Sequence, residues 1–408
     1  MGLEQACQLA VGLGIGFTAF SALIWLGLAL PMVWGQRRIR GLASAPPRAD
    51  AVLPTVTIIS AARDEAVRVE HAADSMLAQE YPGLDVVMVD DRSTDETGAI
   101  LDRLAASDAR FRALHVTSLP EGWLGKCHAL ARGAEVARGD WLLFTDGDVW
   151  MKPDAVRHAI SLAIDLGADH LAVGADLEIH TLGERIFIAY FSALFYASQK
   201  PWEAPDSKSK SHVGIGAFNL VRRDVYDRAG GHTRLRMEVV DDMALGLIVK
   251  QAGGKSWFAL HDGFVRVRWH EGVRGLVRGV EKNSFAALRY RVVETTAAVG
   301  FQFFGTMAPA FGWLLPGPWP KAFAVVGWFG IWLLYRAIGR NLRLRWWDFL
   351  TAPLGAALFS YAILRSMVLT LSRRGVIWRE THYGIEELKK GRVGTLSPDL
   401  RRRLGALK

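Results

Sequence analysis

The chain has 408 residues, of which 50% are hydrophobic and 22% charged, and its formal net charge at pH 7 is +8. The length allows one large catalytic domain with additional segments, and the 15 Trp and 19 Phe direct attention to long apolar runs. Its two cysteines, Cys7 and Cys127, have neither a metal-site spacing nor a disulfide framework. This argues against a disulfide-rich secreted domain and favours a reducing compartment.

The positive charge is concentrated beside the apolar runs. The basic residues concerned are Arg37, Arg38, Arg40, Arg340, Arg343, Arg345, Arg373 and Arg374. Anionic lipids attract basic side chains at the cytoplasmic flank of a membrane segment. The pattern therefore favours a lipid bilayer, and not nucleic acid, as the partner of this charge.

Residues 6–34 are predicted to form an N-terminal transmembrane helix. No side chain from Cys7 to Trp34 is formally charged, and this length is sufficient to cross a hydrocarbon core. A cleaved signal peptide, the alternative, would need a basic leading region and a shorter apolar stretch. The arginines that follow predict a cytosolic position for the next domain, so we expect a multi-pass protein of the cell (inner) membrane.

Residues 35–52, which contain Pro46 and Pro47, are predicted to be a linker to a mixed α/β domain over residues 53–290. Within this domain, β-branched and apolar runs predict strands at 56–60, 85–90 and 141–145, and intervening patterns predict helices at 66–79 and 96–106. Strands that alternate with helices indicate an α/β fold with a mainly parallel sheet covered on both faces.

About three further membrane segments are predicted within residues 296–371, at 296–315, 321–338 and 347–371. The last stretch contains Pro353 and Arg365, and basic residues flank it on both sides. A simple crossing would export the basic tail, residues 372–408, against the positive-inside tendency. A crossing and a re-entrant or interfacial segment are thus both compatible with the sequence.

Acidic residues follow each of the predicted strands. In chain order they are Asp64-Glu65, Asp90-Asp91 and Asp146-Gly147-Asp148, and Asp241-Asp242 stand about 90 residues later. Ligands of open α/β sheets bind outside the carboxyl ends of the strands, so we expect these carboxylates to converge on one crevice.

Asp146 and Asp148 have the chemistry of a hard-cation site. Two carboxylates can hold Mg²⁺ or Mn²⁺ while phosphate oxygens complete the coordination, and such a cation stabilises a departing diphosphate. A solvated turn is the alternative, since Asp and Gly are common there. Asp91 has two similar interpretations, a helix cap, as expected for Asp95, or a partner for a nucleotide base or ribose.

Lys126 and the pair Asp241-Asp242 complete the candidate set. Lys126 follows the glycine turn that ends at Gly125, where it suits either a phosphate or a purely structural turn, and the spacing is not that of a Walker P-loop. Asp241 and Asp242 begin a helix-like stretch. They are either an N-terminal cap or a general base that deprotonates an acceptor hydroxyl.

As an ordered set, these segments resemble the motifs of the membrane-bound branch of the family 2 glycosyltransferases. The matching segments are Ala62-Arg63-Asp64-Glu65, Val89-Asp90-Asp91-Arg92-Ser93-Thr94-Asp95, Gly125-Lys126, Asp146-Gly147-Asp148 and Asp241-Asp242-Met243-Ala244-Leu245-Gly246. The resemblance covers roughly residues 53–290 and implies a GT-A fold, with a Rossmann-like sheet.

The resemblance also implies a role for each residue. Asp91 would bind the base of a nucleotide-sugar donor, with Glu65 and Ala62 nearby, and Lys126 would meet the diphosphate.

On the same resemblance, Asp146 and Asp148 would bind the diphosphate and a Mg²⁺ or Mn²⁺ ion. Asp242 would be the base of a single inverting displacement, beside Asp241, where the family usually has Glu. The tail segment Gly375–Tyr383 is similar to a stretch that follows the last membrane segment in this branch, which includes enzymes that glycosylate carotenoids, hopanoid-type lipids or ceramide-like lipids.

Two departures from the family pattern bear on function. Asp64 stands where Asn is usual, and the Gln/Arg-x-x-Arg-Trp motif of processive relatives is missing at its proper spacing. We therefore favour transfer of one sugar from a nucleotide sugar, by resemblance a uridine-diphosphate sugar, to a membrane lipid. The alternatives are a processive polysaccharide synthase and, from another class, a receptor or scaffold that has lost activity.

Overall fold

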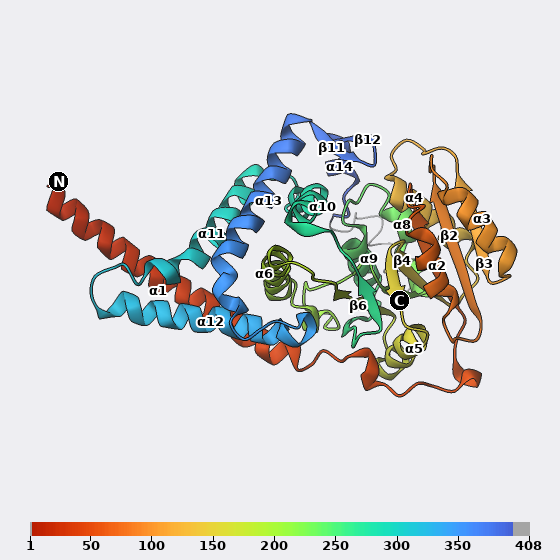
Figure 1. Cartoon of the computed structure of the whole chain (residues 1–408), viewed down its shortest axis with the longest axis horizontal. Helices are drawn as coiled ribbons and strands as arrows, with labels where there is room; N and C mark the ends of the chain where they lie inside the picture. Colours follow the sequence, from red (N-terminus) through yellow and green to blue (C-terminus); the bar gives the residue numbers. More distant parts are fainter. Residues whose placement is uncertain (1, 395–408) are drawn as a thin grey trace. The chain divides into compact units, whose positions relative to one another are not determined.

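A computed structural model describes residues 2–394, and the chain divides into two compact units (Figure 1). The sheet unit contains Ile39–Glu178, Pro201–Trp269 and the chain from Tyr383 onward, and the helical unit contains the chain up to Arg38, Ile179–Lys200 and His270–His382. Of the predicted basic tail, residues 395–408 lie outside the described residues.

The sheet unit is built on a seven-stranded sheet with the order β3-β2-β1-β4-β8-β6-β9. The strands are β1 (Val56–Ala62), β2 (Leu84–Asp91), β3 (Phe111–Val116), β4 (Trp141–Asp146), β6 (His170–Gly174), β8 (Asn219–Arg222) and β9 (Ser256–Leu260). Both neighbours of β8 pair with it in antiparallel fashion, and all other pairs are parallel. The predicted mainly parallel sheet is confirmed.

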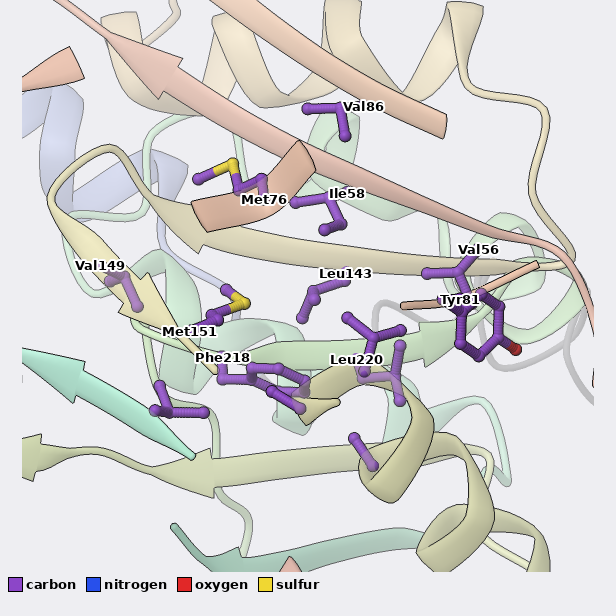
Figure 2. Packing of buried hydrophobic residues seen from close by; sticks show 14 of the residues in the cluster. Val56, Ile58, Met76, Tyr81, Val86, Leu143, Val149, Met151, Phe218 and Leu220 are labelled. Carbon is purple, nitrogen blue, oxygen red and sulfur yellow. The ribbon is translucent and has the colours of Figure 1, made fainter. Parts of the chain in front are cut away.

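Helices cover both faces of this sheet, because successive strand residues are buried on opposite sides. Ile58 packs with α2 (Val69–Leu77), α3 (Thr97–Ser107) and α5 (Ala155–Leu166), whereas its neighbour Ile59 packs with α4 (Gly125–Val136), α7 (Arg223–Ala229) and α9 (Asp241–Gln251). Continuous β-branched runs are what a sheet buried on both faces requires. Figure 2 shows the first of these cores, in which Met76 of α2 lies against Ile58.

A small second sheet lies in the same unit and begins directly after Asp148. Its strands are β5 (Val149–Met151), β10 (Val265–Val267) and β7 (Asp176–Leu177), in the order β5-β10-β7. Val149 and Met151 are almost completely buried in the core of Figure 2. The chain on the far side of Asp148 is therefore as firmly held as strand β4 on the near side.

The helical unit contains the apolar segments of the sequence. Its helices are α1 (Leu3–Gln36), α6 (Leu182–Gln199), α10 (Gly272–Ala287), α11 (Val292–Phe311), α12 (Pro318–Leu342) and α13 (Ala352–Ser372). Within residues 2–394, three helices are long and apolar enough to cross a membrane: Glu4–Gln36, Pro318–Leu342 and Asp348–Ser372. Helix α11, over the predicted segment 296–315, is not among them.

The two features that complicated the last apolar stretch have local explanations. Pro353 occupies the first turn of α13, where a missing N–H leaves no hydrogen bond unmade. Arg365 does not stand alone in the apolar helix, because its Nε lies 3.0 Å from Oε2 of Glu281 on α10. Pairing of this kind is what allows a charge within a membrane helix.

Helix α6 belongs to the helical unit although it interrupts the predicted domain of residues 53–290. Its aromatic side chains account for this. Phe187 and Tyr190 are almost fully buried, and the Phe187 ring packs edge-on against Phe359 of α13 at 5.8 Å between ring centroids. The aromatic-rich segment Leu182–Gln199 is thus a largely buried helix of the helical unit.

Candidate active site

The acidic strand ends lie level with one another at one edge of the main sheet. In the parallel register, Ala61 pairs with Asp146 and Ala62 pairs with Asp90, so β1, β2 and β4 end side by side. Asp91 is the last residue of β2 and Asp146 the last of β4. Carboxylates that are separated in sequence by β-α-β crossovers are in this way brought to a single edge.

Lys126 connects this edge to the start of α9. Its Nζ lies 2.8 Å from Oδ1 of Asp146 and 3.4 Å from Oδ2 of Asp241. Burial alone would lower the pKa of Lys126, but Asp146, Asp241 and Asp242 outweigh burial and raise that pKa well above its ordinary value. Lys126 is therefore a permanently charged ammonium group between two carboxylates.

Asp242 is held by backbone N–H groups beside this ion pair. Its Oδ2 accepts a hydrogen bond of 2.9 Å from the N–H of Gly216, and its Oδ1 accepts one of 2.8 Å from the N–H of Met243. The carbonyl of Gly216 in turn accepts from the N–H of Asp146, at 3.0 Å, which links β4 to the same loop. Burial, followed by the charge of Asp241, raises the pKa of Asp242 to about 6.

Asp241 and Asp242 are not the N-terminal cap of α9, which was one of their two predicted roles. Val240 is the residue before the first turn of α9, and both aspartates lie inside that turn. Their charges still interact favourably with the positive end of the helix dipole. Asp241, only 5% exposed, nevertheless faces Lys126, so its position serves more than the helix.

Asp148 lies among other carboxylates. Burial, followed by the charges of Asp146 and Glu65, raises the pKa of Asp148 to about 6. Glu65 approaches from the β1 loop so closely that a Cβ on Gly147 would lie 2.7 Å from its Oε2. Within residues 2–394, no group of three or more His, Cys, Asp or Glu side chains is arranged to hold a metal ion. Any cation here would be held by fewer protein carboxylates, with other ligands completing its shell.

The donor-side residues form a second contact group around Gly125. Asp91 is 4% exposed, and its Oδ1 accepts a 2.8 Å hydrogen bond from Nε of Arg92, a residue in the left-handed region with φ 60°. A Cβ on Gly125 would lie 2.4 Å from Oδ2 of Asp91, so only glycine allows α4 to begin this close.

Tyr383 is a neighbour of this group that sequence analysis does not predict. Its hydroxyl accepts a 3.3 Å hydrogen bond from the N–H of Gly125 and also hydrogen-bonds to Arg92. The tail motif that ends in Tyr383 is visible in the sequence. Only the structure brings its tyrosine to the start of α4, beside Lys126 and Asp91.

The remaining acidic residues at this edge hold loops together. Asp95 accepts hydrogen bonds from the backbone N–H groups of Ala66 and Thr97, but the N-cap of α3 is Glu96, so Asp95 stands one residue before the cap that was expected of it. Asp64 has φ 52° and accepts a 2.7 Å bond from the N–H of Thr94. This bond uses only an acceptor oxygen, which explains how Asp can stand where the family usually has Asn.

Ala62, predicted on the donor side, has a side chain fully buried in the core of the unit. Only its backbone is available to a ligand. Glu65, in contrast, lies beside Gly147 and so close to Asp146 and Asp148.

A small pocket opens between β4 and α9. It is lined by Lys126, Leu130, Phe144, Thr145, Asp146, Gly216, Asn219, His232, Asp241, Asp242 and Leu245. Most of the predicted catalytic and phosphate-binding residues are therefore neighbours in one cavity. His232 is the functional candidate that sequence analysis missed, and the only signal for it is the glycine pair Gly230-Gly231 immediately before it.

The family model described as "Glycosyl transferase family 2" matches residues 57–230. The chain carries a family 2 glycosyltransferase domain. The matched range contains Asp91, Lys126, Asp146 and Asp148 of the site, whereas Asp242 lies beyond its end.

Curated relatives agree with this glycosyltransferase assignment. The chain is 26% identical over 263 residues to a 4,4'-diaponeurosporenoate glycosyltransferase of Staphylococcus aureus (strain bovine RF122 / ET3-1), a match that covers 63% of this chain and 68% of the relative. The corresponding protein of strain USA300 is 25% identical over 262 residues, with the same coverage of both chains. The chain is thus a glycosyltransferase whose relatives include carotenoid-type enzymes.

A solved structure shows the same fold. The mannosyltransferase PcManGT from Pyrobaculum calidifontis, in complex with GDP-Man and Mn2+, has a TM-score of 0.52 and 20% sequence identity to this chain, covering 88% of this chain and 99% of that one. The GT-A fold implied by the sequence motifs is confirmed for this glycosyltransferase.

Proposed function

We propose that this glycosyltransferase moves one sugar from a nucleotide sugar to a lipid-type acceptor by an inverting displacement, with Asp242 as the general base. The observation that carries the proposal is the environment of Asp242, whose carboxylate is oriented by Gly216 and Met243 and has its pKa raised to about 6. A base is most effective when its pKa is near the working pH. Asp242 would take the proton of the acceptor hydroxyl as the hydroxyl oxygen attacks the anomeric carbon.

Asp146 and Asp148 would hold a divalent cation, Mg²⁺ or Mn²⁺. The fit is supported by the raised pKa of Asp148, which reports its burial and the neighbouring charges of Asp146 and Glu65. Two protein carboxylates with diphosphate oxygens and water are the usual shell of Mg²⁺ in such sites. When bound, the cation would neutralise charge on the departing diphosphate. The Mn2+ of the mannosyltransferase complex is consistent with this assignment.

Lys126 would bind the diphosphate from the other side. It now pairs with Asp146 and Asp241, and a diphosphate with its cation would compete for the ammonium group by offering a higher negative charge. Asp91 would bind the nucleotide base, because its buried carboxylate lies beside Gly125 and thus next to Lys126. We propose a uridine-diphosphate sugar as donor, although the mannosyltransferase complex contains GDP-Man.

The acceptor is proposed to be a membrane lipid of carotenoid type. This rests on the curated relatives, which are named for 4,4'-diaponeurosporenoate, and on the three helices that are long and apolar enough to cross a membrane. We propose a multi-pass position in the inner membrane, with the sheet unit in the cytosol, because basic residues follow the first apolar helix at Arg37, Arg38 and Arg40. Nucleic acid has no place in this scheme.

The test is a transfer assay with the full chain in detergent. UDP- and GDP-sugars are offered singly with a bacterial lipid extract and Mg²⁺ or Mn²⁺, and products are identified by mass spectrometry. We expect lipids heavier by one sugar unit and complete loss of product with a chelator. A ladder of sugar lengths would replace single transfer by polysaccharide synthesis, and binding of donors without any product would overturn the proposal.

A further inference from the structure

His232 lies in the pocket of the glycosyltransferase domain with a fixed orientation. It is 2% exposed and belongs to the short helix α8 (Gly231–Arg234). Its Nδ1 is 2.9 Å from the hydroxyl of Tyr226, and its backbone N–H donates to the same hydroxyl at 3.0 Å. The Phe144 ring packs against the imidazole with 4.5 Å between ring centroids.

These two contacts favour one position for the proton of the imidazole ring. The Tyr226 oxygen already accepts the backbone N–H of His232, and its one hydrogen is free to be donated to Nδ1. Nδ1 is then the acceptor, so the hydrogen of the neutral imidazole is assigned to Nε2. Burial, followed by the charge of Lys126, lowers the pKa of His232 to about 3, which keeps the ring neutral at working pH.

The local backbone is built for this arrangement. Gly230 and Gly231 both have positive φ, 91° and 48°. A Cβ on Gly231 would lie 2.6 Å from the Tyr226 ring, so only glycine lets the chain turn back far enough to place His232 on the tyrosine hydroxyl. The sequence Gly230-Gly231-His232 therefore serves to present one imidazole nitrogen.

The pocket otherwise contains little neutral donor capacity. Asp146, Asp241 and Asp242 offer only acceptor oxygens when ionised, and the ammonium of Lys126 is shared between Asp146 and Asp241. The side-chain hydrogen bond of His232 runs through Nδ1 to Tyr226, and the ring lines the cavity. A hydroxyl group both donates and accepts a hydrogen bond, so it fits between a carboxylate and an imidazole N–H.

We propose that Nε2–H of His232 donates a hydrogen bond to a hydroxyl of the transferred sugar, while the carboxylate of Asp241 accepts from the same hydroxyl. The inference rests on the proposed function, because it takes this small pocket to receive one hydroxyl of the donor sugar. Asp241 is chosen since Asp242 serves as the base and Asp146 faces the diphosphate. His232 is thereby a specificity residue for the sugar part of the donor.

Two side chains of different length test the position of the donor nitrogen. The amide nitrogen of Gln reaches the place of Nε2, whereas that of Asn reaches only the place of Nδ1. We expect His232→Asn to raise the donor KM and lower kcat/KM by roughly 10- to 100-fold, as expected for an unmatched buried hydroxyl. His232→Gln is expected to recover most of that loss. Tyr226→Phe removes the hydroxyl that donates to Nδ1, so either ring nitrogen can carry the hydrogen. Its kcat/KM should lie between those of His232→Asn and His232→Gln.

Deoxy-sugar donors identify the hydroxyl and exclude a merely structural effect. For the one deoxy donor that lacks this hydroxyl, His232→Asn should cause little further loss, because the contact is already absent. Thermal shifts of the same variants with the nucleoside diphosphate alone should equal those of the wild type, and thermal melts verify folding. Equal losses for Gln and Asn with every donor, or unchanged kinetics in a folded Asn variant, would overturn the proposal. An inactive wild type that still binds nucleotide sugars through His232 would instead contradict only the proposed lipid transfer.

Discussion

Two groups of carboxylates lie at the same edge of the sheet and are treated in opposite ways by the fold. In the loop group, Asp64, Asp90 and Asp95 each accept at least one backbone N–H hydrogen bond. The bond from Thr94 lowers the pKa of Asp64, and hydrogen bonds from Thr97 and Ala66 lower that of Asp95 although burial opposes them.

The crowded group consists of Asp146, Asp148, Asp241 and Asp242. At Asp148 and Asp242, burial and repulsion outweigh the hydrogen bonds that would lower the pKa. Burial and neighbouring negative charges raise the pKa of Asp148 and of Asp242 to about 6. Lys126 provides one positive charge for Asp146 and Asp241. The loop group therefore stabilises the fold, whereas the crowded group lowers the stability of the fold, and the proposed cation and donor would offset this cost.

The strongest test of this comparison is one substitution in each group. Asp242→Asn is expected to reduce kcat of sugar transfer by roughly 100- to 10,000-fold, because the general base is lost while the shape is kept. Asp90→Asn should disturb the contacts with Ser93 and His115, and so reduce the melting temperature, with only a small change in kcat. Steady-state kinetics and thermal melts of both variants measure these two effects. Comparable kcat losses in two equally stable variants would erase the distinction.

The pH dependence of transfer should report the crowded group. Asp242 acts as a base only when deprotonated, and its pKa is about 6. We therefore expect kcat/KM to fall about tenfold for each pH unit below 6 and to level off above pH 7. The profile is measured between pH 5 and 8 with saturating metal. A flat profile through this range would show that the group titrating near pH 6 takes no part in the reaction.

Asp148→Asn should stabilise the enzyme in the absence of metal. The folded pKa of about 6 lies above the ordinary value of 3.8, so the folded state binds the proton more tightly and loses stability as pH rises between these values. At pH 7.5 with a chelator, removing this charge is expected to add up to about 3 kcal/mol to the free energy of unfolding. Denaturation of both proteins with and without Mn²⁺ measures this. The gain should vanish when the metal is added, and a destabilised variant in chelator would contradict the charge-crowding account.

Asp95→Ala is expected to have the opposite effect on stability. It removes the acceptor for the N–H groups of Ala66 and Thr97, and the expected loss is about 1 to 2 kcal/mol. Donor KM and kcat should stay near their wild-type values. Chemical denaturation combined with transfer kinetics checks both statements. A large fall in kcat or rise in donor KM, with little loss of stability, would place Asp95 in the crowded group instead of the loop group.

The smallest expected effect is at the tail. Tyr383→Phe removes the hydroxyl that holds Gly125 and Arg92 near Asp91, and we expect a roughly fivefold rise in donor KM with unchanged kcat. Tyr81→Phe is the matched control, because its hydroxyl donates to the Pro54 carbonyl, in a contact with none of the pocket residues. It should reduce stability and leave KM unchanged. An equal rise of KM in both variants would remove Tyr383 from the donor site.

Much of the fold was predictable because it depends on local patterns. The run Val56–Ala62 is mostly apolar and buried on both faces, and the acidic residues follow such runs directly. The antiparallel strand β8 and the departure of α6 into the helical unit were not predictable, because each depends on partners far away in the chain. His232 and Tyr383 were missed for the same reason, since the glycine pair before His232 and the tail motif around Tyr383 do not indicate which distant residues they contact.

Hydrophobic periodicity and turn chemistry act over a few neighbouring residues, so strands, apolar helices and the carboxylates at strand ends can be placed without the folded structure. Whether N–H donors outweigh burial and neighbouring charge at a given carboxylate depends on the folded structure. The same holds for the contacts of His232 with Tyr226, from which we assign the ring hydrogen. These properties depend on distances of a few ångströms between residues such as Lys126 and Asp241, which are separated by more than a hundred positions in the chain and meet only in the folded domain.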